Sequence, residues 1–351
     1  MNLFSKLIKS IFNIQKFNHP NSKYHREAKK LLQEYTAEFD LSKDPKVPFN
    51  ALSKMQWYMA EFIYSAEMLN EVKGIKSSSS QRRNYLLSGA VVAICDLIID
   101  DLDLELAEIK ALKRPSKNSL IERDIFKLYS LLYHTFFDSL GKSAEAVRHY
   151  YELLYEAQIE SIRQFDPKIS KTEVDRICIE KGGYSLLYIR AMLEGEINEL
   201  EERTWYEVGG YIQFCNDAQD LYKDLKNKLR TFGTCRTNLT QIANDLDQQR
   251  MIAFSLLKKC PFKTHNKDFL LFTLYSMGVG IIAKLYRYHL LCKKDFSLET
   301  LTTLLKDEVR SQLQAKKLVG YWLPRVINYR YKNCHEAYNF DFKLKNSHST
   351  H

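Results

Sequence analysis

The amino-acid sequence predicts an all-α protein built around one large helical domain. Apolar residues recur at helical spacing along nearly all of the 351 residues, and no stretch alternates in the way typical of a β-strand. The chain contains only 12 Gly and 7 Pro, so turn signals are few. We therefore expect a single domain of residues 23–335, preceded by residues 1–22 and followed by a polar tail of residues 336–351.

The first segment, residues 1–22, is predicted to form an amphipathic helix that ends at a proline-containing break. Phe4, Leu7 and Ile11 share one helical face, and lysines surround that face. A helix of this kind can rest on a membrane surface, so residues 1–16 could give the protein a peripheral membrane contact. The alternative, which we favour, is a terminal helix that packs on the domain.

Helices are predicted along the rest of the chain, with ends placed to within several residues. Clusters of proline, glycine and serine separate many of them, at residues 44–48, 74–80, 113–116, 166–167 and 260–261. The predicted helices cover residues 24–40, 50–73, 82–110, 119–139, 143–165, 172–202, 204–227, 240–258, 266–291 and 297–330.

Charge and cysteine content narrow the class of protein. The net charge of +9 suits an anionic partner, but no basic run with interleaved aromatic residues and no zinc-finger or helix-turn-helix pattern occurs, so nucleic acid is not an expected partner. The 7 Cys are scattered without a Cys-x-x-Cys pair, which favours reduced thiols in a cytoplasmic protein. No run of about 18 consecutive apolar residues indicates a transmembrane span.

The first of two acidic segments covers residues 95–105. Asp96, Asp100 and Asp101 project together from a helix, and Glu105 lies one turn beyond Asp101. Long apolar residues flank them, so the segment should be partly buried. Buried carboxylates repel one another and are costly to desolvate. A hard cation such as Mg²⁺, which prefers oxygen ligands, would remove that cost.

The second acidic segment covers residues 213–224. Asn216, Asp220 and Asp224 form a row at one-turn spacing, and Asp217 lies beside it. If the two rows face each other, metal ions bound by them would hold a diphosphate between them. A solvated acidic face is the usual explanation for one such segment, but two segments embedded in apolar helix favour a metal site.

Basic residues accompany the second row. Lys181 and Arg190 flank a Gly182-Gly183 pair, and both could bind phosphate if the glycines break the helix. Close helix packing would explain the glycines equally well.

A basic loop, residues 226–238, directly follows the second row. Lys228 and Arg230 could close over a metal-bound diphosphate, with Gly233 as the hinge. The alternative is a solvated connection.

These motifs together resemble those of the class I isoprenoid synthases, a group that includes terpene cyclases, prenyl diphosphate synthases and squalene/phytoene synthases. Residues 97–102 are similar to the first aspartate-rich motif of prenyl synthases, and Asp96, Asp100 and Asp101 match the squalene-type arrangement. Residues 209–220 look like the second prenyl-synthase motif. Lys181-Gly182-Gly183 resembles the lysine-bearing helix break, and Arg330-Tyr331 resembles the C-terminal pair of bacterial cyclases. Leu104 departs from the pattern, because an acid is expected there.

The resemblance implies a helical bundle around a central apolar cavity, with a linear prenyl diphosphate as substrate and Mg²⁺ as cofactor (three ions, or Mn²⁺ in their place). The metal ligands would be Asp96, Asp100, Asp101, Glu105, Asn216, Asp217, Asp220 and Asp224. Lys181, Arg190, Lys228 and Arg230 would bind the diphosphate, and the catalytic groups would be Arg190, Lys228, Arg230, Arg330 and Tyr331.

A terpene cyclase is the favoured subclass, because Asn216, Asp220 and Asp224 match the cyclase ligand spacing and no Gly-Lys-Arg segment offers a site for a second diphosphate. Arg82-Arg83 and Lys113-Arg114 are the only substitutes for such a segment. A prenyl transferase, either chain-elongating or head-to-head, is the alternative. A catalytically silent helical binding protein is a further one, and the chain could form a homodimer.

Overall fold

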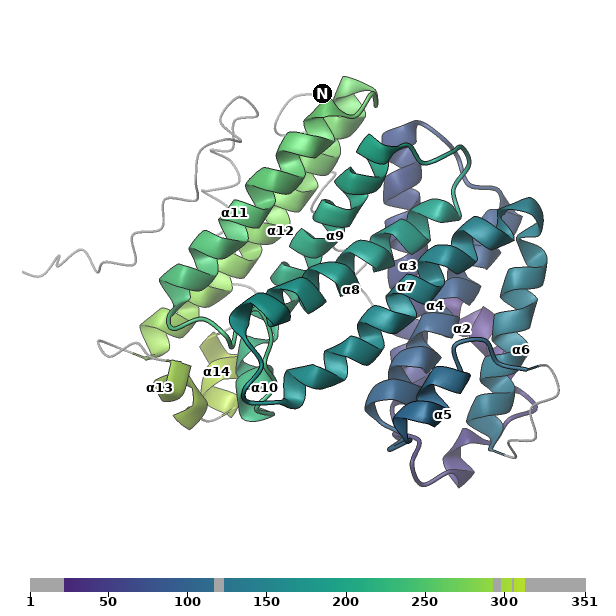
Figure 1. Cartoon of the computed structure of the whole chain (residues 1–351), viewed down its shortest axis with the longest axis horizontal. Coiled ribbons are helices and arrows are strands. Elements are labelled where there is room, and N and C mark those ends of the chain that lie inside the picture. Colours follow the sequence, from purple (N-terminus) through teal and green to yellow (C-terminus); the bar gives the residue numbers. More distant parts are fainter. Residues whose placement is uncertain (1–21, 117–122, 293–297, 305, 313–351) are drawn as a thin grey trace, which may run out of the picture.

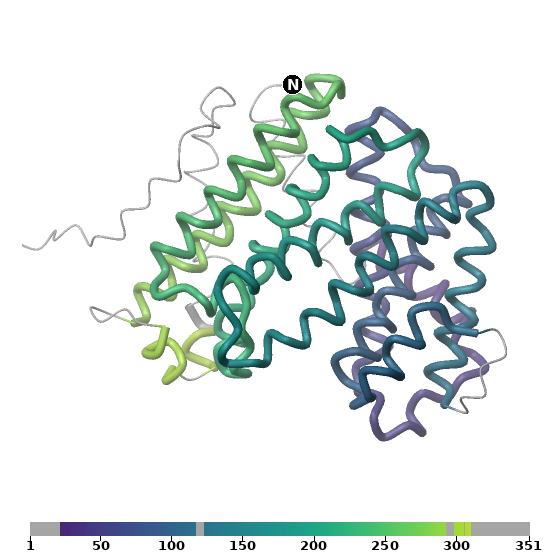
Figure 2. The backbone as a smooth tube through the Cα atoms, viewed as in Figure 1, coloured from purple at the N-terminus to yellow at the C-terminus, as the bar shows by residue number. Residues whose placement is uncertain are grey.

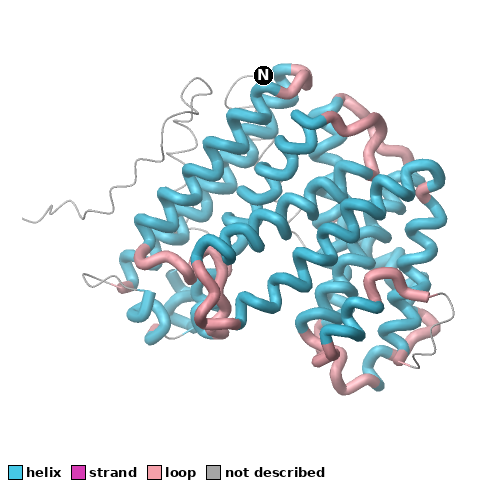
Figure 3. Tube along the Cα trace, viewed as in Figure 1, coloured by secondary structure: helices cyan, strands magenta, loops and turns pink. Residues whose placement is uncertain are grey.

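The structure, a computed structural model, describes residues 22–116, 123–292, 298–304 and 306–312. These residues form helices joined by loops and contain no strand, which confirms the predicted all-α class (Figure 3). The predicted N-terminal helix, the polar tail and the Arg330-Tyr331 pair lie outside the described residues.

The described helices follow the predicted order. They are α2 (Lys23–Thr36), α3 (Ala51–Lys73), α4 (Ser79–Asp100), α5 (Leu106–Ala111), α6 (Asp124–Ser139), α7 (Ala144–Glu160), α8 (Lys171–Ala191), α9 (Glu199–Gln219), α10 (Leu221–Lys226), α11 (Leu239–Lys259), α12 (Thr264–Leu291), α13 (Leu298–Thr303) and α14 (Lys306–Gln312). Short 3-10 helices occupy η1 (Leu41–Lys43), η2 (Gly141–Ser143) and η3 (Ser161–Phe165).

Two predicted helices end earlier than expected. The helix predicted over residues 82–110 stops at Asp100, and residues 101–105 turn into the separate helix α5. The helix predicted over residues 172–202 stops at Ala191. Gly195 then adopts a φ of 89°, and Asn198 caps α9 by accepting a hydrogen bond from the backbone N–H of Glu201 at 2.9 Å. A glycine turn and an asparagine cap are strong stop and start signals, so α9 begins at residue 199 and not at 204.

The helices pack in sequence order across the molecule. Figure 1 and the backbone trace in Figure 2 show α11 and α12 side by side at one edge, α8 and α7 across the middle, and α2, α3, α4 and α6 at the other edge. Helix α8 packs between α7 and α9, and α9 packs in turn on α11 and α12. This order places α4, α8 and α9, which carry the predicted site residues, in the body of the bundle.

Aromatic rings fill the interior between α4, α6, α7 and α8. Tyr188 is fully buried, and its ring meets the rings of Phe62, Phe136 and Tyr151 at centroid distances of 6.0, 6.1 and 5.9 Å. The contacts with Phe62 and Phe136 are edge-to-face and that with Tyr151 is tilted, and such ring pairs add to the stabilisation that comes from buried area. The abundance of tyrosine in the sequence is thus used largely in the core.

Helix α12 is the one described helix that is long and apolar enough to cross a membrane. Most of its apolar stretch is buried inside the molecule, where it packs on α9, α11 and α3. Burial of this kind is what the core helix of a bundle requires.

Candidate functional site

Helices α8 and α9 cross at a pair of glycines. A Cβ atom on Gly182 would lie 2.3 Å from the carbonyl oxygen of Gly209, and one on Gly209 would lie 2.2 Å from that of Gly182. Only glycine permits such an approach of two backbones. Because α8 continues from Lys171 to Ala191 without interruption, the predicted helix break is wrong, and the alternative of close packing is correct.

Lys181, next to this crossing, interacts electrostatically with both acidic segments. Three carboxylates show this, Asp96 and Asp100 in α4 and Asp217 in α9. Desolvation is the largest single influence on each pKa and, taken by itself, raises it. The ammonium group of Lys181 lowers each of these pKa values. Attraction strong enough to shift a pKa requires the charges to be close. The charge of Lys181 on α8 therefore acts on carboxylates of both acidic segments.

Asp96 is the most enclosed carboxylate of the first row. Its Oδ2 atom lies 2.7 Å from Nζ of Lys54 and accepts a 3.0 Å hydrogen bond from the hydroxyl of Tyr58. Its Oδ1 atom accepts a 2.9 Å bond from Nε2 of Gln158. Burial raises the pKa of Asp96, but Lys181 and Lys54 outweigh it and leave that pKa below its ordinary value. Asp96 is thus ionised and already paired.

Asp100 is less well satisfied. It accepts only long contacts from Nε2 of Gln158, at 3.3 and 3.4 Å. Desolvation by its surroundings and then the neighbouring charge of Asp96 raise its pKa to about 6, although the residue itself is exposed to solvent. A carboxylate in this state gains most from an added cation.

The other two acids of the first segment differ in surroundings. Asp101 lies 3.2 Å from Nζ of Lys54 and is partly open to solvent. Glu105 does not extend the row, because α4 has already ended. It caps α5 in a capping box with Glu108, so its assignment as a metal ligand on the same helical face is corrected.

The second row spans the junction between α9 and α10. The backbone N–H of Asp220 donates to the carbonyl of Asn216 at 2.9 Å, and that of Asp224 donates to the carbonyl of Asp220 at 2.9 Å. The one-turn spacing that the sequence predicts is therefore kept across the junction. Burial increases along the row, from exposed Asn216 to buried Asp224.

Asp224 carries the most perturbed carboxylate of this row. Burial, followed by the charges of Asp217 and Asp220, raises its pKa to about 7. The hydroxyl of Thr231 donates to it at 3.1 Å. Lys284 of α12 lies beside the row, where it donates to the carbonyl of Gln219 and attracts Asp220.

Asp217 makes its hydrogen bonds to groups of the protein. Its buried carboxylate accepts hydrogen bonds from Gln213 at 2.7 Å, from the Cys178 thiol at 3.0 Å and from the backbone N–H of Phe232 at 3.1 Å. With both oxygen atoms engaged by three donors, Asp217 anchors the loop that follows α10. This corrects its assignment as a metal ligand.

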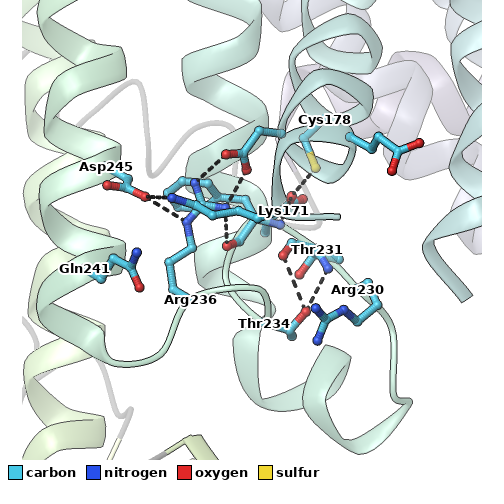
Figure 4. Close-up of polar contacts among 12 residues, drawn as sticks. Lys171, Cys178, Arg230, Thr231, Thr234, Arg236, Gln241 and Asp245 are labelled. Atoms are coloured by element: carbon cyan, nitrogen blue, oxygen red, sulfur yellow. Dashed lines mark hydrogen bonds and ion pairs between the residues drawn. The ribbon is translucent and has the colours of Figure 1, made fainter. Parts of the chain in front are cut away.

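The basic loop is fixed along much of its length, as Figure 4 shows around Arg236. Phe232 is fully buried and stacks on Phe214 with ring centroids 3.9 Å apart. Arg236 covers Phe232 at 4.0 Å and pairs with Asp175 and Asp245 at 2.5 and 3.0 Å. A loop held by buried rings and ion pairs does not serve as a hinged lid, so that prediction is wrong for residues 231–236.

The two predicted phosphate-binding residues of this loop lie apart from its anchored part. Lys228 is exposed at a turn, with a φ of 57°. The backbone of Arg230 is held by Gln164 through reciprocal bonds of 2.8 and 2.9 Å. The Nε atom of Arg230 is buried and has no hydrogen-bond partner within the described residues. An unsatisfied buried donor on a cation is what an anionic ligand would complete.

Arg190 is a structural residue. Its side chain is fully buried, pairs with Glu201 through Nε at 2.6 Å and through Nη2 at 3.1 Å, and donates to the carbonyls of Gly195 and Glu196. Its N–H groups are directed at these partners, so little capacity remains for a phosphate. These contacts favour a structural role over the predicted catalytic and diphosphate-binding role.

Sequence reasoning missed the side chains that surround the rows from other helices. These are Lys54 and Tyr58 of α3, Gln158 of α7 and Lys284 of α12. No local pattern marks them, because each reaches its aspartate from a distant part of the chain.

The donor set agrees with Mg²⁺ in chemistry but is not gathered. Within the described residues, no three or more His, Cys, Asp or Glu side chains stand close enough together to hold a metal ion. The available donors are carboxylate and amide oxygens, which Mg²⁺ prefers. Among these acids the pKa is raised at Asp100, Asp217 and Asp224, in each case chiefly by desolvation.

Comparison of the chain with models of known protein families, with curated proteins and with solved structures found no match.

Proposed function

We propose that the protein is a Mg²⁺-dependent class I isoprenoid synthase that ionises a linear prenyl diphosphate and cyclises or rearranges the resulting cation. The observation that carries this proposal is the shared position of Lys181. Its ammonium group lowers the pKa of carboxylates on both α4 and α9, and Lys181 directly precedes the glycine crossing of α8 and α9. Both observations favour two acidic segments that border one region, as a diphosphate held from two sides requires.

Each row would contribute oxygen ligands to the metal. On the first row these are Asp96, Asp100 and Asp101, and on the second Asn216, Asp220 and Asp224. Bound Mg²⁺ would neutralise the charge that develops on the departing diphosphate. Glu105 and Asp217 are left out, because one caps a helix and the other anchors a loop.

Lys181 and Arg230 would bind the diphosphate directly. The charge of Lys181 acts on Asp96 and Asp100 of the first row and on Asp217 beside the second, and Arg230 has a buried donor with no partner in the described part of the chain. Lys228 is exposed at the loop turn and would add charge from outside. Arg330 and Tyr331, which lie outside the described residues, keep their proposed role by resemblance alone.

The hydrocarbon chain would extend toward the aromatic interior. Tyr188 follows Lys181 by seven residues on α8, so both lie on one face of that helix. The rings around Tyr188 could stabilise a carbocation through their electron-rich faces. The buried hydroxyl of Tyr188 has no hydrogen-bond partner within the described residues, so this one polar group of the aromatic cluster is left without a hydrogen bond from the described protein.

Two basic pairs, Arg82-Arg83 and Lys113-Arg114, could replace the missing Gly-Lys-Arg segment as a site for a second diphosphate. Their ion pairs instead favour a reaction with one diphosphate substrate. Arg82 pairs with Glu27 and Glu67, and Arg83 pairs with Glu34. Lys113 and Arg114 pair with acids of α7 in the same way. Cations already neutralised by the protein are poor sites for a second diphosphate, which favours a terpene cyclase over a prenyl transferase.

The test is diphosphate release from labelled geranyl, farnesyl and geranylgeranyl diphosphates in Mg²⁺, together with analysis of the extracted hydrocarbon. We expect release and a cyclic or rearranged product from one of these substrates. Asp100→Asn and Asn216→Ala should lower the rate by about 100-fold or more.

Lys29→Gln, at an exposed position of α2, is the control and should keep the wild-type rate. A wild-type protein that releases no diphosphate from any of the three substrates, or variants with unchanged rates, would refute the proposal. Products longer than the substrate would instead identify a prenyl transferase.

A further inference from the structure

Lys54 places a cation of the protein on the first acidic row. Its Nζ atom lies 2.7 Å from Oδ2 of Asp96 and 3.2 Å from Oδ2 of Asp101. The side chain of Lys54 is only 26% exposed and that of Asp96 only 11%, so water screens this pair weakly. Lys54 belongs to α3, which packs directly on α4, so the contact joins two adjacent helices.

This contact uses the oxygen atoms that a metal would need. Oδ2 of Asp96 receives both Lys54 and the hydroxyl of Tyr58, and Oδ1 receives Gln158. Tyr58 and Gln158 are neutral donors that could remain beside a metal-bound carboxylate. The ammonium group could not, because two cations would then compete for one oxygen atom and repel each other.

The same contact already neutralises two of the three acids of the first row. Within the described residues, no three acidic, His or Cys side chains are grouped to hold a metal. Asp96 and Asp101 share the Lys54 ammonium group, whereas Asp100 makes only the long contacts to Gln158. A monovalent counter-ion on a flexible stem satisfies the charge of the row and leaves each carboxylate in its own position.

We propose that Lys54 is a resident counter-ion of the first acidic row, which a divalent cation must displace in order to bind there. The inference rests on the proposed function, because it takes the first row to be a cation site. The metal must outcompete an ammonium group that is covalently attached to the protein. A higher cation concentration is therefore needed to occupy the row than if Lys54 were absent. Without the metal, Lys54 keeps the partly buried row from carrying uncompensated charge.

The first experiment measures Mn²⁺ binding without substrate, by the loss of the free-ion signal in electron paramagnetic resonance. Lys54→Gln should bind Mn²⁺ about tenfold more tightly than the wild type, a size typical of coupling between sites. Lys54→Arg keeps the charge and should not bind more tightly.

Lys46→Gln is the matched control. It removes one positive charge from the same end of the molecule, where Lys46 faces Asp103 at 3.7 Å on the surface, and it should change the affinity less than about twofold. Equal or weaker Mn²⁺ binding by Lys54→Gln would overturn the inference.

Lys54→Gln removes the ammonium group that pairs with buried Asp96, a loss that can affect folding, so the second experiment uses the unaltered protein. Reductive methylation of lysines is followed by peptide mass spectrometry with and without Mn²⁺. The labelling rate of Lys54 should rise several-fold when the cation binds, because the ammonium group is released, and the rate of Lys46 should not change. A Lys54 rate that is insensitive to bound cation would also overturn the inference.

The outcomes separate this inference from the proposed function. If the wild type binds no divalent cation, both fail together. If it binds the cation while Lys54 affects neither affinity nor labelling, the metal site stands and only the displacement of Lys54 is wrong.

Discussion

The backbones of Gly182 in α8 and Gly209 in α9 lie in direct contact, so that a Cβ atom on either residue would stand within 2.3 Å of the other's carbonyl oxygen. This contact sets the spacing of the two helices at the point where Lys181 meets the second acidic segment. The relationship explains two features that look unrelated in the sequence, a glycine pair inside one helix and a glycine one turn before an acidic motif in the next.

Alanine at the glycine crossing should be strongly destabilising. Gly182→Ala would force the helices apart and should lower the free energy of unfolding by about 1–3 kcal/mol, although alanine is otherwise the better helix former. Chemical denaturation measures this. Gly210→Ala is the control, since its Cβ would meet side chains and no backbone, those of Ile179 at 3.1 Å and Gln249 at 3.4 Å, and it should cost less. Equal effects of the two substitutions would contradict a backbone contact.

Replacement of Lys181 should affect function more than folding. Lys181→Met removes the charge that both acidic segments share, so prenyl diphosphate turnover should fall by about 100-fold while the helical circular dichroism spectrum is kept. Steady-state diphosphate release measures the effect. Lys171→Gln on the same helix, where Lys171 pairs with Asp245 at 2.9 Å, should retain turnover. Full activity in Lys181→Met would remove the central role assigned to this residue.

Arg190 should matter for stability. Arg190→Met removes the shortest ion pair of buried Glu201, which keeps only Lys73 at 3.7 Å and Trp205 at 3.1 Å, and should lower the free energy of unfolding by about 3–5 kcal/mol. Urea denaturation followed by circular dichroism measures the loss. Arg203→Met, at an exposed position of α9, should change it by less than about 0.5 kcal/mol. A stable Arg190→Met protein that lacks diphosphate binding would restore the functional role.

Asp217 should hold the loop after α10. Asp217→Ala leaves the thiol of Cys178 and the backbone N–H of Phe232 unsatisfied, which should cost about 1–3 kcal/mol. Hydrogen–deuterium exchange of the peptide that covers residues 229–236 should become faster, while exchange in α6 should not change. Unaltered exchange in that peptide would show that contacts other than those of Asp217 are enough to hold the loop in place.

Asp224 should make stability depend on pH in the absence of metal. Its pKa is raised from the ordinary value of 3.8 to about 7, so the folded protein holds a proton that the unfolded chain has lost between those values. The free energy of unfolding should therefore fall as pH rises from about 4 to about 7 and then level off.

Thermal unfolding in a chelating buffer tests this. Asp224→Asn should remove part of the decline and be more stable than the wild type at pH 8. Asp307→Asn, at an exposed position, should follow the wild type at every pH. If the stability of Asp224→Asn falls by the same amount over this pH range, the decline is caused by other titrating groups and not by Asp224.

The class of fold and most helices could be read from the sequence, because helical periodicity and caps are local. The capping box of Ser78 and Gln81 begins α4, and Gly74, with a φ of 73°, ends α3 as a glycine stop signal predicts. Errors arose where apolar spacing continued past a turn, as at residues 101–105, since periodicity alone does not register the end of a helix.

The sequence by itself determined an all-α chain and the one-turn spacing of Asn216, Asp220 and Asp224, which needs nothing beyond the geometry of a helix. Only the tertiary structure decided how each charge is used. Arg190 became a buried structural cation, and Asp217 became a loop anchor. Lys54 came to lie on the first row from a different helix. The role of a charged group depends on burial and on partners, and those partners come from parts of the chain that local sequence does not connect.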